Sequence, residues 1–207
     1  MISWIDMRVT DLRTTLRHIG LERIMAAATS LLSAEAYAAM PCSGDPTELV
    51  RGKIVDVPHT TPHCGEICTH IIHALGKHFE THDLGHLVSN HSAVVTQRHP
   101  DTVRGAYVAF YSYERVPKGP LPWDYLPVAP DLVFEVLSPT DRWSHVQVKV
   151  AEYLDAGVRA VCFVHNDTRS VHMFRPDQPK RIFKAVDEFS LPELLGEFRV
   201  KVERFFE

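Results

Sequence analysis

The sequence predicts a single α/β domain, and three observations carry that prediction. Two apolar runs, at 132–137 and 160–164, are typical of central strands that are covered on both faces. The amphipathic segment 144–155 lies between them and predicts a helix. A strand, a helix and a strand within about 35 residues form the βαβ unit of two parallel strands.

Composition narrows the class of protein. A chain of 207 residues with 45% apolar content can bury a sizeable core in one domain. Its net charge of -4, with acids and bases mixed, gives no global attraction to nucleic acid or membranes, so any DNA contact needs a local basic patch. The uncharged stretch 24–34 is shorter than the roughly 20 residues that span a bilayer, and we expect no membrane partner.

The cysteines indicate a reducing compartment. Four cysteines occur in a chain that shows no secretory signal. Free thiols in the cytoplasm are therefore expected rather than disulfides. These cysteines are Cys42, Cys64, Cys68 and Cys162.

The N-terminal residues form an extension to the predicted domain. Residues 1–32 scatter arginines among apolar positions and are interpreted as a helical extension, while the domain itself is placed at 33–207. Met25 is an alternative start of the protein.

A short helix and a hairpin begin the domain. Residues 33–40 predict a helix, because Ser33 can accept hydrogen bonds from the first free amides and a proline follows the last residue. Residues 48–57 are apolar on both sides of Arg51-Gly52, which predicts a hairpin with a two-residue turn.

A long helix and two strands follow. Residues 64–82 predict a helix with one apolar face, formed by Cys64, Ile67, Cys68, Ile71, Leu75 and Phe79. Strands are predicted at 85–96 and 103–113, and the Pro- and Gly-rich segment 116–130 predicts a surface loop.

The C-terminal part of the chain completes the predicted sheet. Gly157 is a candidate C-cap for the helix 144–155. Edge strands are predicted at 170–175 and 180–185, before a closing segment that ends in Phe205 and Phe206.

Two carboxylates on the strand 132–137 and its entrance are candidates for chemistry. A buried Glu135 is costly unless a metal ion, a buried Arg or Lys, or a solvated cleft compensates its charge, and the sequence leaves these alternatives open. Asp131 points to the same strand face, and two such carboxylates can bind a hard cation. A Pro-Asp pair at a strand entrance is, however, also typical of a turn.

Lysine, histidine and cysteine side chains are further candidates. Lys149 lies at the rim of the apolar stripe of its helix, where it either reaches the cleft above the sheet or lies in solvent. Cys64 and Cys68 fall on the core face of the helix 64–82, whereas His70 and His73 fall opposite. One tetrahedral ion could not collect them, so we expect buried, inert thiols and no structural zinc.

Four segments together, by their order and spacing, match a known family; they are 47–55, 102–110, 130–139 and 149–157. From about residue 33 to 206 the chain resembles the Uma-two family of restriction-endonuclease domains, within the PD-(D/E)XK nuclease superfamily. The resemblance implies a restriction-endonuclease-like fold, which is a mixed central sheet flanked by helices. It also implies a Mg²⁺ (or Mn²⁺) site where the sheet splays open, and hydrolysis of phosphodiester bonds in DNA.

The resemblance also assigns residues to the site. Glu48 and Glu135 match the acidic positions of the family, and Lys149 matches a lysine that has moved from the strand onto the following helix. Leu137 stands where the wider superfamily usually has that lysine. The implied catalytic residues are Glu48, Glu135 and Lys149. The implied metal ligands are Glu48 and Glu135, with Asp131 as a rescue ligand.

One departure from the family concerns its metal-binding aspartate. That aspartate lies in a Pro-Asp pair on the preceding strand, where this sequence has Ala106 and Tyr107. A tyrosine is neutral near pH 7 and is a poor ligand for a hard divalent ion, so cation affinity should fall.

Two functions therefore compete. The first is a working or weakened Mg²⁺-dependent DNA endonuclease. The second is a catalytically inactive nuclease-fold protein that binds nucleic acid or a protein partner. Four basic residues near the C-terminal strands, Arg175, Lys180, Arg181 and Lys184, are candidates for DNA contact. Paired nuclease domains often cut two strands as dimers, so a homodimer is a further expectation.

Overall fold

The computed structural model describes residues 31–41, 44–138 and 141–207. Most of the expected N-terminal extension, including Met25, lies outside the described residues, and so does Cys42. No helix among the described residues is both long enough and apolar enough to cross a membrane.

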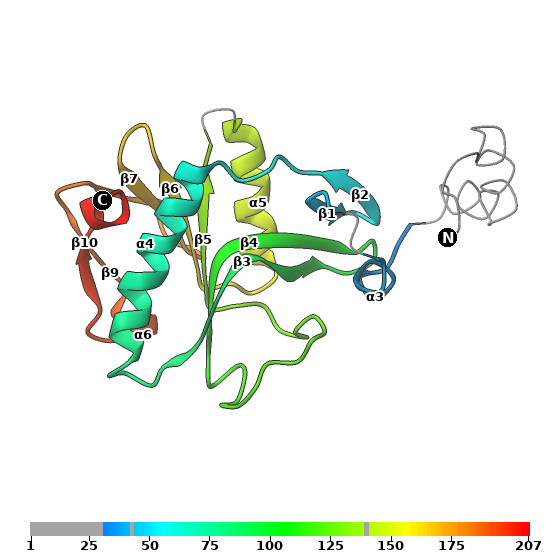
Figure 1. Cartoon of the computed structure of the whole chain (residues 1–207), viewed down its shortest axis with the longest axis horizontal. Helices are drawn as coiled ribbons and strands as arrows, with labels where there is room; N and C mark the ends of the chain where they lie inside the picture. The colour runs from blue at the N-terminus through cyan, green and yellow to red at the C-terminus, as the bar shows by residue number, and fades with distance from the viewer. Residues whose placement is uncertain (1–30, 42–43, 139–140) are drawn as a thin grey trace, which may run out of the picture.

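A mixed sheet forms the centre of the molecule (Figure 1). Among the described residues it has eight strands in the order β2-β1-β4-β5-β6-β7-β8, and β3 pairs with β4. The strands are β1 (Thr47–Val50), β2 (Lys53–Asp56), β3 (Gly85–Gln97), β4 (Thr102–Ser112), β5 (Leu132–Leu137), β6 (Ala160–His165), β7 (Ser170–Phe174) and β8 (Arg181–Lys184).

Helices and a small second sheet surround the central sheet. The helices are α3 (Ala34–Ala38), α4 (Pro62–Phe79), α5 (Trp143–Asp155), α6 (Pro192–Leu195) and the 3₁₀ helix η1 (Val202–Phe205). The second sheet pairs β9 (Glu188–Ser190) with β10 (Arg199–Lys201). Each helix and strand predicted between residues 33 and 185 is therefore present, while the predicted helical extension lies almost wholly outside the described residues.

The parallel pair predicted from the βαβ pattern is confirmed. β5 and β6 pair in parallel along their whole length, from Leu132 opposite Ala160 to Leu137 opposite His165. α5 connects them, and the other pairings of the sheet are antiparallel. The sheet is thus mixed, as the family resemblance implies.

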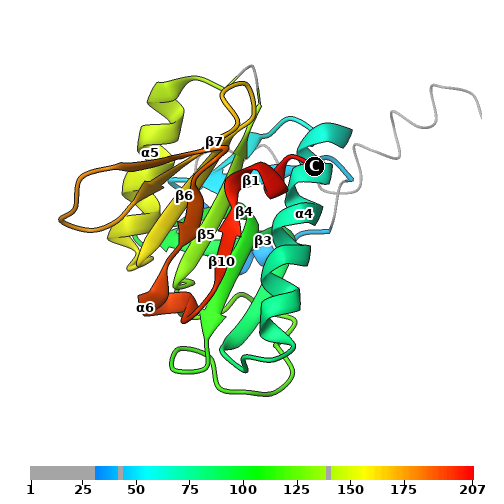
Figure 2. The ribbon, with the colours of Figure 1, turned by 90° about the vertical axis from the view of Figure 1, so that its left-hand side faces the viewer.

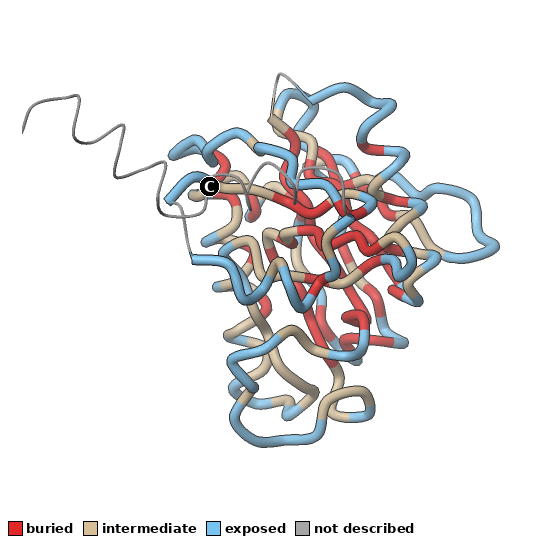
Figure 3. Tube along the Cα trace, turned by 90° about the vertical axis from the view of Figure 1, so that its right-hand side faces the viewer, coloured by how far each residue is buried: buried red, intermediate tan, exposed pale blue. Residues whose placement is uncertain are grey.

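Each face of the sheet has its own apolar core. α4 and the C-terminal segment cover one face, and α5 covers the other, so that the two long helices lie on opposite sides of the strands (Figure 2). β5 serves both cores, because Phe134 and Val136 face the α4 side while Val133 and Leu137 face the α5 side. Buried residues gather along the central strands and exposed residues in the connections (Figure 3).

Local sequence signals explain the hairpin and the start of α4. Arg51 and Gly52 both have positive φ, as the two central residues of a tight hairpin turn require. α4 begins at Pro62, two residues earlier than predicted, because the Thr61 side chain accepts a hydrogen bond from the Cys64 amide. The helix ends at Phe79 rather than at residue 82.

The C-terminal segment contains more structure than its sequence predicts. Residues 188–205 form β9, α6, β10 and η1, which are three or four residues long and thus too short to show a helical or strand period. Their aromatic side chains Phe189, Phe198 and Phe205 complete the core beneath α4. The two closing phenylalanines noted in the sequence therefore differ, since Phe205 is fully buried and Phe206 is only partly buried.

Candidate active site

The site lies where β4 and β5 separate. These two strands pair only from Phe110 opposite Leu132 to Val108 opposite Phe134. Beyond that point β5 continues along β6, whereas β4 turns toward β1 and pairs there through Val103 and Leu49. The sheet thus opens at the C-terminal half of β5, which is the half that carries Glu135.

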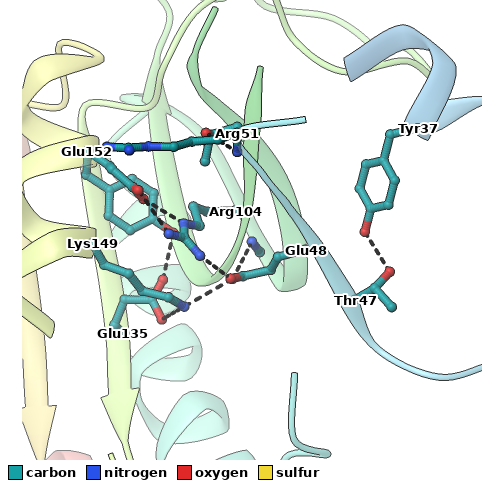
Figure 4. A network of polar contacts seen from close by, with 11 residues as sticks. Tyr37, Thr47, Glu48, Arg51, Arg104, Glu135, Lys149 and Glu152 are labelled. Carbon is teal, nitrogen blue, oxygen red and sulfur yellow. Dashed lines mark hydrogen bonds and ion pairs between the residues drawn. The ribbon is translucent and has the colours of Figure 1, made fainter. Parts of the chain in front are cut away.

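Glu48, Glu135 and Lys149 converge at this opening from three separate elements (Figure 4). Lys149 Nζ lies 3.1 Å from Glu48 Oε1 and 3.8 Å from Glu135 Oε2. The two carboxylates are almost fully buried, with exposed fractions of 4% and 3%, while the lysine side chain keeps 25% exposure. The structure therefore brings together the three residues that the family resemblance assigns to catalysis.

Three residues that sequence reasoning missed complete the network. Arg104 on β4 donates a hydrogen bond of 2.7 Å to Glu48 Oε2. It also donates two hydrogen bonds, of 2.6 and 2.9 Å, to the Glu152 carboxylate. The Tyr153 hydroxyl donates to Glu135 Oε1 over 2.7 Å. Glu152 and Tyr153 follow Lys149 by three and four residues, so all three lie on one face of α5. The sequence did contain a signal for these three residues, namely the spacing of Glu152 and Tyr153 from Lys149 and the presence of an arginine inside an apolar strand.

Charge and burial shift the pKa values of the two carboxylates in opposite directions. Burial acts to raise the pKa of Glu48, but Lys149 and Arg104 together lower that pKa below its ordinary value. Burial raises the pKa of Glu135, and the Lys149 charge and the Tyr153 hydrogen bond offset this rise only in part. Burial acts to lower the pKa of Lys149, yet Glu135 and Glu48 raise it, so the lysine is a cation at neutral pH.

Tyr107 lies on β4, at the position where the family resemblance implies an aspartate. Its ring lies 4.3 Å from the His91 ring, measured between centroids, and His91 Nε2 lies 2.9 Å from the Thr60 hydroxyl. Burial raises the pKa of Tyr107, so the phenol is neutral near pH 7 and adds no negative charge to the site. His91 lies in a β-bulge of β3, between Ser89 and Ser92, where Asn90 and His91 both have positive φ.

Asp131 lies in a different cluster from Glu135. Its carboxylate is 3.0 Å from Arg115 Nε and 3.4 Å from Arg159 Nη1, and it accepts a 2.8 Å hydrogen bond from the Ser112 amide. Four residues along a strand span about 13 Å, which is too far for two side chains to share one ion. The carboxylate therefore anchors the start of β5 to the loop after β4.

The polar groups of the site only partly fit a divalent ion. Among the described residues, no three His, Cys, Asp or Glu side chains are grouped so as to hold a metal. Glu48 and Glu135 do converge, and Mg²⁺ binds through one or two carboxylates together with waters and substrate phosphates. The donor set thus suits an ion that arrives with a phosphate better than one that is held permanently.

Comparisons with known proteins support the fold and a nuclease relationship. A family model described as "Putative restriction endonuclease" (Uma2) matches residues 34–203. A crystal structure described as that of a putative nuclease belonging to DUF820 from Anabaena variabilis superposes with a TM-score of 0.73. The two sequences are 17% identical, and the match covers 84% of this chain and 97% of the other. A search of curated proteins found no match.

Proposed function

Because the chain belongs to the Uma2 family, whose members are described as putative restriction endonucleases, we propose that it hydrolyses phosphodiester bonds in DNA with the help of Mg²⁺ or Mn²⁺. The observation that carries the proposal is the convergence of Glu48, Glu135 and Lys149 where β4 and β5 separate. An accidental ion pair would not explain why two strands and a helix each direct a charged side chain to one opening in the sheet.

Glu48 and Glu135 are the residues that would hold the ion. A bound divalent cation supplies a Lewis acid for the phosphate and lowers the pKa of an attacking water. The affinity of this site for the ion is low, because Tyr107 contributes no charge and both oxygens of Glu48 already have cationic partners. Activity is therefore expected at millimolar rather than micromolar concentrations of the ion.

Lys149 has a separate role in the proposed reaction. Its ammonium group is held at the opening by both carboxylates and remains partly exposed, so a phosphate can approach it. A fixed positive charge next to a phosphate stabilises the negative charge that develops during hydrolysis, and it does so most effectively in a partly dehydrated site.

A second candidate function is a nuclease fold that binds nucleic acid, or a protein partner, without cutting. Tyr107 favours it, because one acidic ligand of the family is absent. The four basic residues named from the sequence as candidates for DNA contact differ in how free their side chains are to bind a phosphate. Arg175 pairs with Glu193. Lys180, Arg181 and Lys184 are all exposed, although Lys180 lies over the Trp143 ring and Arg181 over the Phe183 ring.

A plasmid-nicking assay tests the first function. Purified protein is incubated with supercoiled DNA and increasing Mg²⁺ or Mn²⁺, and slow nicking that depends on the ion is expected. Glu135→Ala should abolish the nicking. Glu114→Ala, which removes an exposed carboxylate from the loop after β4, should leave it unchanged.

The same samples decide between the two functions. If no metal supports nicking, but the protein still retards DNA at low salt, the second function is correct. If Glu135→Ala cuts as fast as the original chain, a contaminating nuclease is responsible and the assignment of the site is wrong.

A further inference from the structure

Arg104 is the most tightly held cation of the site. Its guanidinium spans two carboxylates, with Nη1 on Glu48 and with Nε and Nη2 on Glu152 (Figure 4). The arginine side chain is only 10% exposed, and the two carboxylates are 4% and 14% exposed. These two carboxylates raise the pKa of the arginine despite its burial, so it is charged at neutral pH.

The two candidate metal ligands, Glu48 and Glu135, differ in how many hydrogen bonds their carboxylate oxygens already accept. Glu48 Oε2 accepts from Arg104, while Glu48 Oε1 accepts from Lys149 over 3.1 Å and from the Gly105 amide over 3.2 Å. Glu135 has one hydrogen bond, from Tyr153, and its other oxygen lies 3.8 Å from Lys149. The oxygens of Glu48 are thus less available to an incoming divalent ion than those of Glu135.

We propose that Arg104 is a built-in competitor of the divalent ion for Glu48, and that Glu152 limits this competition by sharing the arginine. The inference rests on the proposed function, because it concerns the ion of that same site. It deepens that function by naming the residue pair that sets the affinity for the ion. Arg104 acts through Glu48 and is a positioning residue.

Opposite charge effects distinguish this role from a purely structural one. Removing Arg104 frees Glu48 Oε2 and removes a positive charge close to the ion, so ion affinity should rise. Neutralising Glu152 removes a negative charge and leaves the whole guanidinium to Glu48, so ion affinity should fall. If Arg104 only held the fold together, loss of either partner would weaken ion binding.

The experiment measures Mn²⁺ binding to the full chain without DNA, from the electron paramagnetic resonance signal of the free ion. Arg104→Gln should bind Mn²⁺ about tenfold more tightly than the original chain, and Glu152→Gln should bind it several-fold more weakly. Arg115→Gln is the matched control, because Arg115 also pairs with a buried carboxylate but lies in the Asp131 cluster. It should leave Mn²⁺ affinity unchanged.

A charge-conserving double variant covers the case in which Arg104→Gln does not fold. Arg104→Gln/Glu152→Gln removes one positive and one negative charge, and it should still bind Mn²⁺ more tightly than the original chain because Glu48 Oε2 no longer has a cationic partner. Circular dichroism checks that each variant is folded. Equal or weaker binding by the folded double variant would overturn the inference, as would a fall in affinity for Arg104→Gln.

The outcome separates this inference from the proposed function. If the affinities follow the expected order and no variant nicks DNA, the nuclease proposal fails while Arg104 keeps its role. If nicking is observed but Mn²⁺ affinity does not respond to Arg104 or Glu152, the nuclease proposal stands and this inference is wrong.

Discussion

Tyr107 and Glu135 are the first residues beyond the last paired positions of β4 and β5, at Val108 and Phe134. They consequently flank the opening of the sheet from its two sides. The burial that raises the pKa of the Glu135 carboxyl also raises the pKa of the Tyr107 phenol. The position for which the family resemblance implies an aspartate is thus occupied by a neutral ring beside a buried acid.

Replacing Tyr107 by aspartate should restore a ligand and strengthen metal-dependent cutting. The change adds a carboxylate next to the opening, and a third acidic ligand raises the affinity for a hard divalent ion. We expect Tyr107→Asp to nick plasmid at least tenfold faster than the original chain at limiting Mn²⁺. Tyr107→Phe, which keeps the ring and adds no charge, is the matched control and should not accelerate nicking. If Tyr107→Asp is inert with every metal tried, the lost-ligand explanation should be dropped.

Stability should depend on pH through Glu135. Its pKa is raised above the ordinary value of 4.5, so its contribution to stability is complete below that pH and is lost as the pH rises through the raised pKa. Glu135→Gln does not titrate, so as the pH rises above 4.5 this variant should gain stability relative to the original chain. The gain is about 1.4 kcal/mol for each unit by which the pKa is raised. Urea unfolding at several pH values measures it.

Glu48 provides the opposite control for that experiment. Its pKa is lowered, so its contribution to stability is present above pH 4.5 and is lost as the pH falls through the lowered pKa. Glu48→Gln should therefore lose stability relative to the original chain above pH 4.5, and this deficit should shrink in acid. If the stability of the two variants relative to the original chain changed with pH in the same direction, the opposite pKa shifts of Glu48 and Glu135 would be contradicted.

Asp131 should matter for stability and not for the ion. Its carboxylate compensates Arg115 and Arg159 and accepts from the Ser112 amide, so Asp131→Asn leaves both guanidinium groups without a counter-charge. Because both arginines are partly exposed, a loss of roughly 2–3 kcal/mol in unfolding free energy is expected. Mn²⁺ affinity should not change. A clear fall in that affinity in the folded variant would mean that Asp131 is a ligand after all.

The main elements of the fold could be predicted because their signals are local. The apolar run of β5, the apolar face of α4 and the turn at Arg51-Gly52 depend on residues that are near one another in the chain. The segment 188–205 escaped prediction because its elements are short and are stabilised by packing beneath α4. Short segments of this kind take their structure from tertiary contacts.

The site was predictable only in part, for a similar reason. Glu135 and Lys149 were candidates from their places in the strand and the helix, whereas Glu48 was named only from the family resemblance; the structure places all three together. Spacing alone would have paired Glu135 with Asp131, which shares its strand face but lies about 13 Å away along the strand. The contact between Arg104 and Glu152 joins residues 48 positions apart, and no periodic pattern encodes such a pair.

Binding to DNA should depend on salt through the exposed lysines near β8. Each phosphate neutralised by a lysine releases counterions, so the logarithm of affinity falls with the logarithm of salt by about 0.9 per contact on double-stranded DNA. Lys180→Gln/Lys184→Gln should therefore make that dependence shallower by roughly two contacts. Arg175→Gln is the matched control, because its guanidinium is already paired with Glu193 and should make little difference. Fluorescence anisotropy of a labelled duplex, titrated at several salt concentrations, measures both slopes. A flat response to salt in the original chain would count against nucleic acid as the partner.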